Sequence, residues 1–173
     1  KSGGMTARDG FLIVGLSWIA MSLFGALLFV LTGDIPNYID ALFETISGLT
    51  TTGASVVTSP ESMTRGGMFW RLFTHWIGGM GILVFVLAVL PMSGNRSMHI
   101  MRAEVPGPTV GKLVPRIRKT ASILYLLYIA LTLVEMVLLI AGGMSFYDAL
   151  LHAFATAGTG GLSTRALSIG YYN

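Results

Sequence analysis

The sequence predicts an all-α membrane protein built from repeats, each with a spanning helix, a half-length helix with its loop, and a second spanning helix. Three observations predict this fold class. Hydrophobic residues make up 53% of the chain and charged residues only 11%, whereas soluble domains carry about 25% charged residues. Three long runs are almost free of charge. Two short segments, 108 residues apart, share a pattern and each ends in a loop of threonine and glycine.

The first spanning helix is predicted at Phe11–Leu31, which holds 21 consecutive uncharged residues. At 1.5 Å per residue this length crosses the roughly 30 Å of a bilayer's hydrocarbon core. Residues 1–10 form a polar N-terminal segment before it, and Gly33 and Pro36 end it. One complete crossing is therefore expected before the first short segment.

The first short segment, Asp40–Leu49, extends only about 15 Å as a helix and is too short to span. Asp40 is the expected N-cap. The helix is followed by a loop of small and hydroxylated residues, namely Thr50, Thr51, Thr52 and Gly53. A half-length helix that points its negative C-terminal end at crowded backbone carbonyls can replace the hydration shell of a monovalent cation. The stretch therefore predicts a pore helix and a selectivity filter.

A second copy of this stretch, Asp148–Ser163, aligns without a gap on Asp40–Ser55. The two copies are identical at six of sixteen positions, which indicates an internal structural repeat. Asp148 is the expected second N-cap. The predicted second filter consists of Gly158, Thr159, Gly160 and Gly161.

The other spanning helices are predicted at Met68–Leu90, ending at Pro91, and at Ala121–Ala141. The glycines of the former, Gly78, Gly79 and Gly81, fit close helix packing or a role at the pore. Between these helices lies a basic connection with a single acid, Glu104. Its basic residues are Arg96, Arg102, Lys112, Arg116, Arg118 and Lys119. By the positive-inside rule, the connection and the N-terminal segment are cytoplasmic, so both filters open outward.

The sequence thus divides into an N-terminal segment (1–10), a first repeat (11–92), the connection (93–120) and a second repeat that stops after its filter (121–173). Two charges, Arg71 and Glu135, lie inside apolar runs near the outer surface. They either pair with each other, or Arg71 reaches the lipid headgroups while Glu135 is protonated or bonded elsewhere. His152 occupies the repeat position of Glu44 and is expected to pack or form hydrogen bonds rather than bind a metal.

Several function classes are disfavoured. The chain has no cysteine, hence no thiol nucleophile, and its basic residues are not interleaved with aromatics as in a nucleic-acid site. His75 and nearby serines show no catalytic spacing, and neither Thr/Gly loop has the lysine of a phosphate-binding loop. We therefore expect no enzyme and no nucleic-acid partner. A non-conducting packing or assembly subunit is the stronger alternative.

Three segments, DALFETISGLTTTGAS, FWRLFTHWIGGMGILV and HAFATAGTGGLSTRALSIGYYN, resemble the membrane subunit of the Trk/Ktr potassium transporters. The resemblance extends over nearly the whole chain. It implies potassium-channel-like helix/pore-loop/helix repeats with re-entrant pore helices, four per protein, so that this chain is a piece with two of them. It also implies potassium uptake across the cell inner membrane by a multi-pass homodimer with a cytoplasmic nucleotide-binding regulatory subunit.

By the same resemblance, potassium binds at Thr50–Gly53 and at Gly158–Gly161, and no organic cofactor is implied. Many relatives carry Ile-Gly-Gly-Phe-Ser in the second filter, where this chain has Thr159-Gly160-Gly161-Leu162-Ser163. This departure leaves two possibilities open, selectivity for potassium alone or transport of potassium with sodium. Channel-like conduction and symport with a coupling ion also both remain open.

Overall fold

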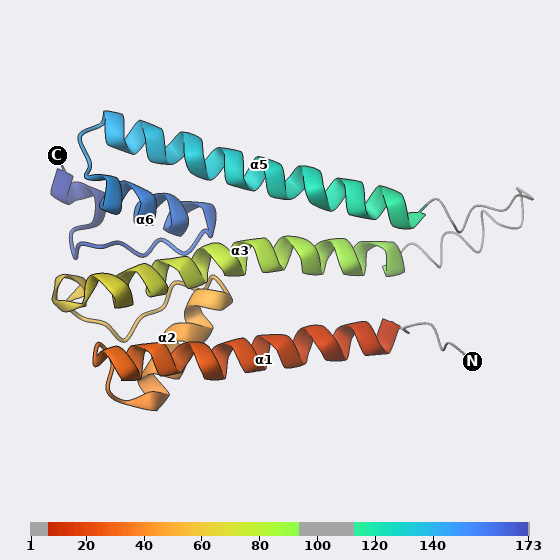
Figure 1. Ribbon diagram of the computed structural model, residues 1–173, viewed down its shortest axis with the longest axis horizontal. Helices are drawn as coiled ribbons and strands as arrows, with labels where there is room; N and C mark the ends of the chain where they lie inside the picture. The colour runs from red at the N-terminus through yellow and green to blue at the C-terminus, as the bar shows by residue number, and fades with distance from the viewer. Residues whose placement is uncertain (1–6, 94–112, 173) are drawn as a thin grey trace, which may run out of the picture.

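The structure is a computed structural model that describes residues 7–93 and 113–172, with side chains at 12–81 and 119–172 (Figure 1). Every regular element in these residues is helical. The elements are α1 (Ala7–Thr32), α2 (Tyr38–Leu49), η1 (Pro60–Ser62), α3 (Arg65–Ser93), α5 (Leu113–Ala141), α6 (Phe146–Ala157) and η3 (Ser168–Tyr172). The predicted all-α fold is confirmed.

The three long helices, α1, α3 and α5, run side by side, with α3 between the other two (Figure 1). The short helix α2 packs against α1 and α3, and α6 packs against α3 and α5. Both short helices begin at the same end of the bundle and stop partway along it, and the chain then returns to that end (Figure 1). Because α3 contacts all four other α-helices, it forms the centre of the described bundle.

Among the residues whose side chains are described, two long stretches are apolar enough to cross a membrane, Leu12–Thr32 in α1 and Lys119–Ala141 in α5. Only 17% of the first and 11% of the second is buried inside the bundle. A core helix of a soluble protein would be mostly covered, because large exposed apolar surfaces are unfavourable in water. These exposed faces therefore fit a lipid environment. The predicted span Met68–Leu90 stays a prediction, since the side chains from residue 82 onward lie outside the described part.

The core has two clusters, one on each side of α3. The first lies between α3 and α6, and its members are Met68, Leu72, Leu151, Phe154 and Ala155. The second lies between α1 and α2, and its members are Ala26, Phe29, Ile35 and Ala41. Each short helix thus buries one apolar face against a long helix, which fixes its position in the bundle.

The N-caps of the short helices differ from the prediction. The side chain of Asn37 caps α2 by accepting a hydrogen bond from the Ile39 N–H, and Ser145 caps α6 by accepting one from the Asp148 N–H. Asp40 and Asp148 lie in the first turns instead. The predicted caps were wrong because both helices begin about one turn earlier, after Asn37 and Ser145, whose backbones are extended. The negative charges of the two aspartates instead interact favourably with the positive end of the helix dipole.

The remaining boundaries extend the predicted ones. α1 begins at Ala7, α3 runs from Arg65 past Pro91 to Ser93, and α5 begins at Leu113. A proline removes one backbone hydrogen bond, so a helix can continue past it when it lies close to the end. Residues 94–112 of the basic connection, with Arg96, Arg102 and Lys112, lie outside the described residues.

A carboxylate links the end of α1 to the start of α3. Asp34, just after α1, accepts hydrogen bonds of 2.7 Å from both the backbone N–H and the hydroxyl of Thr64, just before α3. Burial raises the pKa of Asp34, but the hydrogen bonds from Thr64 and Thr32 lower it by more, so the pKa lies below its ordinary value. The ionised form is therefore favoured in the folded state.

We predict that Asp34→Asn lowers the melting temperature of the detergent-solubilised protein at pH 7. Since the pKa of Asp34 is depressed on folding, its contribution is present above the unfolded-state pKa and is lost as the pH falls through the folded-state pKa. The difference between wild type and Asp34→Asn should therefore shrink in acid. A melting series from pH 7 to pH 3 measures this, and a constant difference would contradict the assignment.

Candidate functional site

The two short helices and their loops match each other element by element. α2 begins at Tyr38 and ends at Leu49, and α6 begins at Phe146 and ends at Ala157, so both boundaries differ by 108 residues. The caps follow the same offset, since Asn37 corresponds to Ser145. The offset that aligns the sequences therefore also aligns the structures.

The first loop, residues 50–53, begins with a helix-terminating turn. The Thr51 N–H donates to the carbonyl of Gly48 at 3.0 Å, and the Thr52 N–H donates to the carbonyl of Ser47 at 2.9 Å. This pair of bonds is the Schellman motif. Thr51 has a φ of +56°, and Gly53 has a φ of +75°.

The second loop, residues 158–161, has the same backbone pattern. The Thr159 N–H donates to the carbonyl of Thr156, and the Gly160 N–H donates to the carbonyl of Ala155, both at 2.9 Å. The φ angles are +57° at Thr159 and +69° at Gly161. Loop N–H groups thus bond back to the helix, and these bonds do not engage the carbonyl oxygens of the loops.

Threonine is an unusual residue at the left-handed position of this motif. Glycine is preferred there, and a β-branched residue with positive φ is a genuine outlier that costs about 1–3 kcal/mol. Thr51 and Thr159 both take that conformation at the same repeat position. Strain of this kind concentrates at functional sites, so these two threonines mark the loops as the candidate site.

The remaining predicted residues complete the two loops. The Thr50 hydroxyl bonds to the Ile46 carbonyl at 2.8 Å and lies 2.8 Å from the Thr52 hydroxyl. The loops also contact each other, because a Cβ added at Gly53 would lie 2.1 Å from the carbonyl oxygen of Gly160. The structure therefore brings the two predicted loops together. Whether any of these residues bind an ion stays a prediction.

Behind the first loop lies a buried ion pair that sequence reasoning missed. Together with Ser55, which is itself exposed, it forms the Ser55 cluster of Glu44, Ser55 and Arg71. The Arg71 Nε lies 2.6 Å from Glu44 Oε1, and their side chains are 3% and 1% exposed. The Ser55 hydroxyl accepts a hydrogen bond from Arg71 Nη2 at 2.7 Å and lies 3.0 Å from the carboxylate. The Val56 N–H donates to Glu44 Oε2 at 3.0 Å. The cluster joins α2, α3 and the chain leaving the first loop.

The second repeat has a counterpart, the Ser163 cluster of His152 and Ser163. His152 Nδ1 lies 2.7 Å from the Asp148 carbonyl oxygen, which can only accept, so Nδ1 carries a proton. Nε2 forms a hydrogen bond of 2.8 Å with the Ser163 hydroxyl. The Arg165 N–H donates to the same hydroxyl at 3.1 Å, as the Val57 N–H does to Ser55 at 2.9 Å. His152 has the predicted hydrogen-bonding role.

The proposed contact between Arg71 and Glu135 was wrong, and so was the alternative that Arg71 reaches the lipid headgroups. Arg71 is buried and paired with Glu44, whereas Glu135 is half-buried on α5. Depth in the bilayer does not fix the rotation of a helix, so the depth argument could not identify the partner. Glu44 occupies the same repeat position as His152, and this was the sequence signal that could have identified Glu44 as the partner of Arg71.

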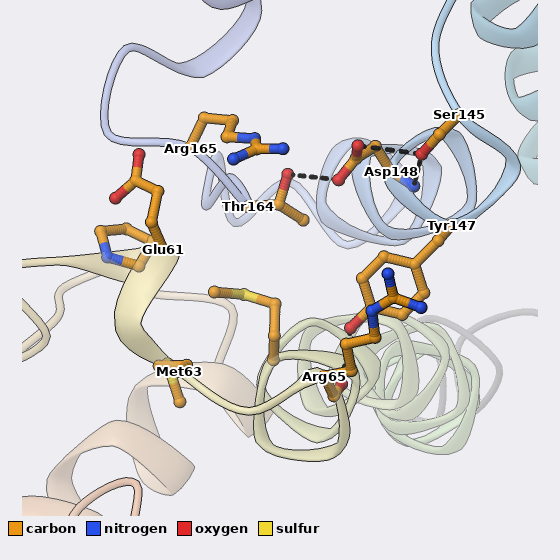
Figure 2. A pocket seen from close by; sticks show the side chains of 10 residues that line it. Glu61, Met63, Arg65, Ser145, Tyr147, Asp148, Thr164 and Arg165 are labelled. Carbon is orange, nitrogen blue, oxygen red and sulfur yellow. Dashed lines mark hydrogen bonds between the residues drawn. The ribbon is translucent and has the colours of Figure 1, made fainter.

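A cavity of about 360 Å³ opens beside the start of α6 (Figure 2). Its lining includes the side chains of Glu61, Arg65, Tyr147, Asp148, Thr164 and Arg165. Burial raises the pKa of Asp148, but hydrogen bonds from the hydroxyls of Thr164 and Ser145 outweigh that effect and lower it. A hydrogen bond from the Ala166 N–H lowers the pKa of Glu61. Both carboxylates are therefore ionised at neutral pH.

Figure 2 shows that residues from both halves of the chain line this cavity. The Thr164 hydroxyl donates to Asp148 Oδ1 at 2.8 Å, within the second repeat. Glu61, in η1 between α2 and α3, accepts a hydrogen bond from the Ala166 N–H at 2.7 Å. The chain following the second loop is thus attached to both halves at the end where the short helices begin.

The exposed apolar spans and the paired half-length helices are those of a membrane protein with an internal repeat. Residues 2–173 match the TrkH family, described as "Cation transport protein", and the chain belongs to that family. The resemblance identified from the sequence motifs is confirmed.

The chain is 44% identical over 171 residues to the Trk system potassium uptake protein TrkH of Halomonas elongata and 43% identical over 176 residues to that of Escherichia coli K12. It covers 36% of each of these relatives, while they cover 98% and 100% of it. The crystal structure of the potassium transporter TrkH from Vibrio parahaemolyticus matches with a TM-score of 0.77 at 38% identity, over 98% of this chain and 33% of that one. The chain thus spans about a third of these relatives.

We predict that Glu44 and Arg71 are strongly coupled. Removing one partner of a buried pair typically costs about 3–5 kcal/mol, because it leaves the other charge unpaired. Glu44→Gln and Arg71→Met should each destabilise the protein strongly, and the double variant should lose much less than the sum of the two. Thermal unfolding in detergent measures all four proteins of the cycle.

The cycle of Arg71→Met with Glu135→Gln serves as the control, and its losses should add because those two residues are not paired. Additive losses in the cycle of Glu44 with Arg71 would contradict the assigned pair.

Proposed function

We propose that this chain supplies two of the ion-coordinating loops of a potassium uptake protein, through which potassium moves down its electrochemical gradient. One observation carries the proposal. Two loops 108 residues apart take the same backbone path, with threonine in the left-handed region at Thr51 and Thr159, and lie against each other at Gly53 and Gly160. The names of the relatives supply the ion.

The chemistry of such a site is carried by backbone carbonyls. α2 and α6 end at Thr50 and Gly158, so the negative ends of both helix dipoles lie at the loops. Carbonyl oxygens there would replace the water that a potassium ion sheds. The filter residues are then Thr50–Gly53 and Gly158–Gly161, and the half-length helices are re-entrant pore helices. Such loops are tolerated at membrane depth where they line a cavity.

The wider assembly follows the family resemblance. The first repeat would extend over residues 11–92 and the second would begin at 121, with further pore loops in the rest of the protein. We propose that the complete protein is a homodimer in the cell inner membrane and binds a cytoplasmic nucleotide-binding regulatory subunit. Its role would be transport rather than catalysis.

The orientation is supported by the arrangement of the helices. The start of α1, the end of α3 and the start of α5 lie together at the end of the bundle opposite to the starts of α2 and α6 (Figure 1). The basic connection and the N-terminal segment adjoin that end. Because basic loops remain in the cytoplasm, the filters open to the outside.

A non-conducting packing subunit is the rival function. It would have no need for threonine in the left-handed region at the same position of both loops, where glycine costs less. Transport of sodium together with potassium is distinguished by the uptake experiment below.

We predict that Gly53→Ser in the full-length transporter abolishes rubidium uptake or changes its ion preference. Gly53 has positive φ, and a Cβ there would lie 2.1 Å from the Gly160 carbonyl oxygen, so the two loops would have to separate. Uptake is measured in cells that lack other potassium systems, with sodium as competitor and the amount of membrane protein determined in parallel.

Gly33→Ser is the matched control. Gly33 has a φ of +76° but open space around its Cβ position, so this variant carries the same backbone penalty without the loop contact. Its uptake per molecule should equal that of wild type. Unchanged uptake and ion preference in Gly53→Ser would refute the filter assignment.

We predict that a cysteine placed at Ser59 reacts with an impermeant thiol reagent added from outside, whereas one placed at Ser97 does not. Ser59 is exposed at the end where the short helices begin, and Ser97 belongs to the basic connection. The chain has no cysteine of its own, so the background is low. Labelling of Ser97→Cys but not of Ser59→Cys would indicate the opposite orientation in the membrane.

A further inference from the structure

The side chain of His75 is a buried imidazole for which the two-loop site has no assigned role. It lies on α3, is fully buried and is among the largest side chains with that degree of burial. Its Nδ1 lies 3.4 Å from the Arg71 carbonyl oxygen, a long contact. Its Nε2 is buried with no hydrogen-bond partner among the described residues. The ring is therefore held by its surroundings rather than by strong polar bonds.

Those surroundings are the glycines of both repeats. A Cβ added at Gly160 would lie 1.7 Å from His75 Cδ2 and 2.3 Å from Nε2. A Cβ at Gly158 would lie 2.5 Å from the His75 carbonyl oxygen. On the other side, a Cβ at Gly48, near the end of α2, would lie 3.6 Å from Nδ1. The ring thus lies directly against Gly160 of the second loop, whereas on the α2 side the nearest side chain to Gly48 is that of Thr74.

The absence of a side chain at Gly160 is what admits the ring. The three atoms nearest to the added Cβ at Gly160 all belong to the imidazole, and Gly160 is not among the residues with positive φ. Its backbone could therefore accept alanine, and the His75 ring is the nearest obstacle to the added Cβ. Since the ring is fully buried, it cannot move aside at low cost.

The contact continues into the first loop. Gly160 lies against the His75 ring on one side, and its carbonyl oxygen lies against Gly53 on the other. A change in the size of residue 75 would therefore move the second loop relative to the first. Ion preference at a carbonyl site depends on the spacing and number of its oxygens.

We propose that His75 is a positioning residue that sets the spacing of the two loops by its size, and thereby sets the preference for potassium over sodium. The inference rests on the proposed function, because it acts through loops assigned there as filters. His75 itself touches no ion in this account. Its role is to support Gly160 of the second loop from α3, at a distance set by the imidazole ring.

The first test exchanges size between the two positions. Gly160→Ala should sharply reduce both folded protein and rubidium uptake, and His75→Ala added to it should restore folded protein and much of the uptake. Gly66→Ala, on α3 with open space at its Cβ, is the matched control and should resemble wild type. Wild-type uptake in Gly160→Ala, or no restoration in the double variant, would overturn the proposal.

The second test separates spacing from folding. In the full-length transporter, His75→Ala should raise the KM for rubidium several-fold and weaken discrimination against sodium at a matched amount of folded protein. His75→Leu, which nearly keeps the volume, should stay close to wild type. Equal effects of leucine and alanine would overturn the role of size, and failure of both variants to fold would assign His75 to folding instead.

Comparison with Gly53→Ser separates the role of His75 from the filter assignment on which it rests. If Gly53→Ser alters uptake while His75→Ala leaves KM and ion preference unchanged, the role of His75 is wrong and the filter assignment stands. If neither variant alters uptake, the filter assignment itself fails.

Discussion

The ion pair between Glu44 and Arg71 is the interaction on which the arrangement of the first half depends. Each charge loses several kcal/mol of hydration when it is buried, so the pair depends on further hydrogen bonds to its polar atoms. Ser55 and the Val56 N–H supply these to Glu44 and to Arg71 Nη2, whereas Arg71 Nη1 has no partner among the described residues. Because these groups come from α2, α3 and the chain after the first loop, satisfying them fixes the rotation of both helices and the return path of the chain. The geometry of the first loop follows from that path.

The second half reaches the same geometry with different chemistry. His152 bonds to Ser163 where Glu44 bonds to Ser55, and an imidazole replaces the carboxylate of the first half. The serine is common to both copies, since its hydroxyl can accept a backbone N–H two residues later and also bond to the short helix. The repeat is therefore preserved more fully in its backbone hydrogen bonds than in its residue types.

The sequence was sufficient for the features set by local pattern. The length of an apolar run predicted α1 and α5, and the threonine-glycine pattern at a constant offset located both loops. The N-cap at Asn37 was missed because an aspartate three residues later also favours a helix start. The partner of Arg71 was missed because helix rotation depends on packing between segments distant in the chain. The space filled by His75 was invisible for the same reason, since it arises only where α2, α3 and the second loop meet.

The order in which the chain is made gives the ion pair a second consequence. Glu44 precedes Arg71 by 27 residues. During synthesis α2 therefore leaves the ribosome before α3, whose Arg71 pairs with the Glu44 carboxylate. A lone carboxylate in the bilayer costs about 2.5–3.5 kcal/mol on insertion scales, which disfavours entry of α2 on its own. Membrane insertion of the first half would then be cooperative, with α2 remaining at the aqueous interface until α3 arrives.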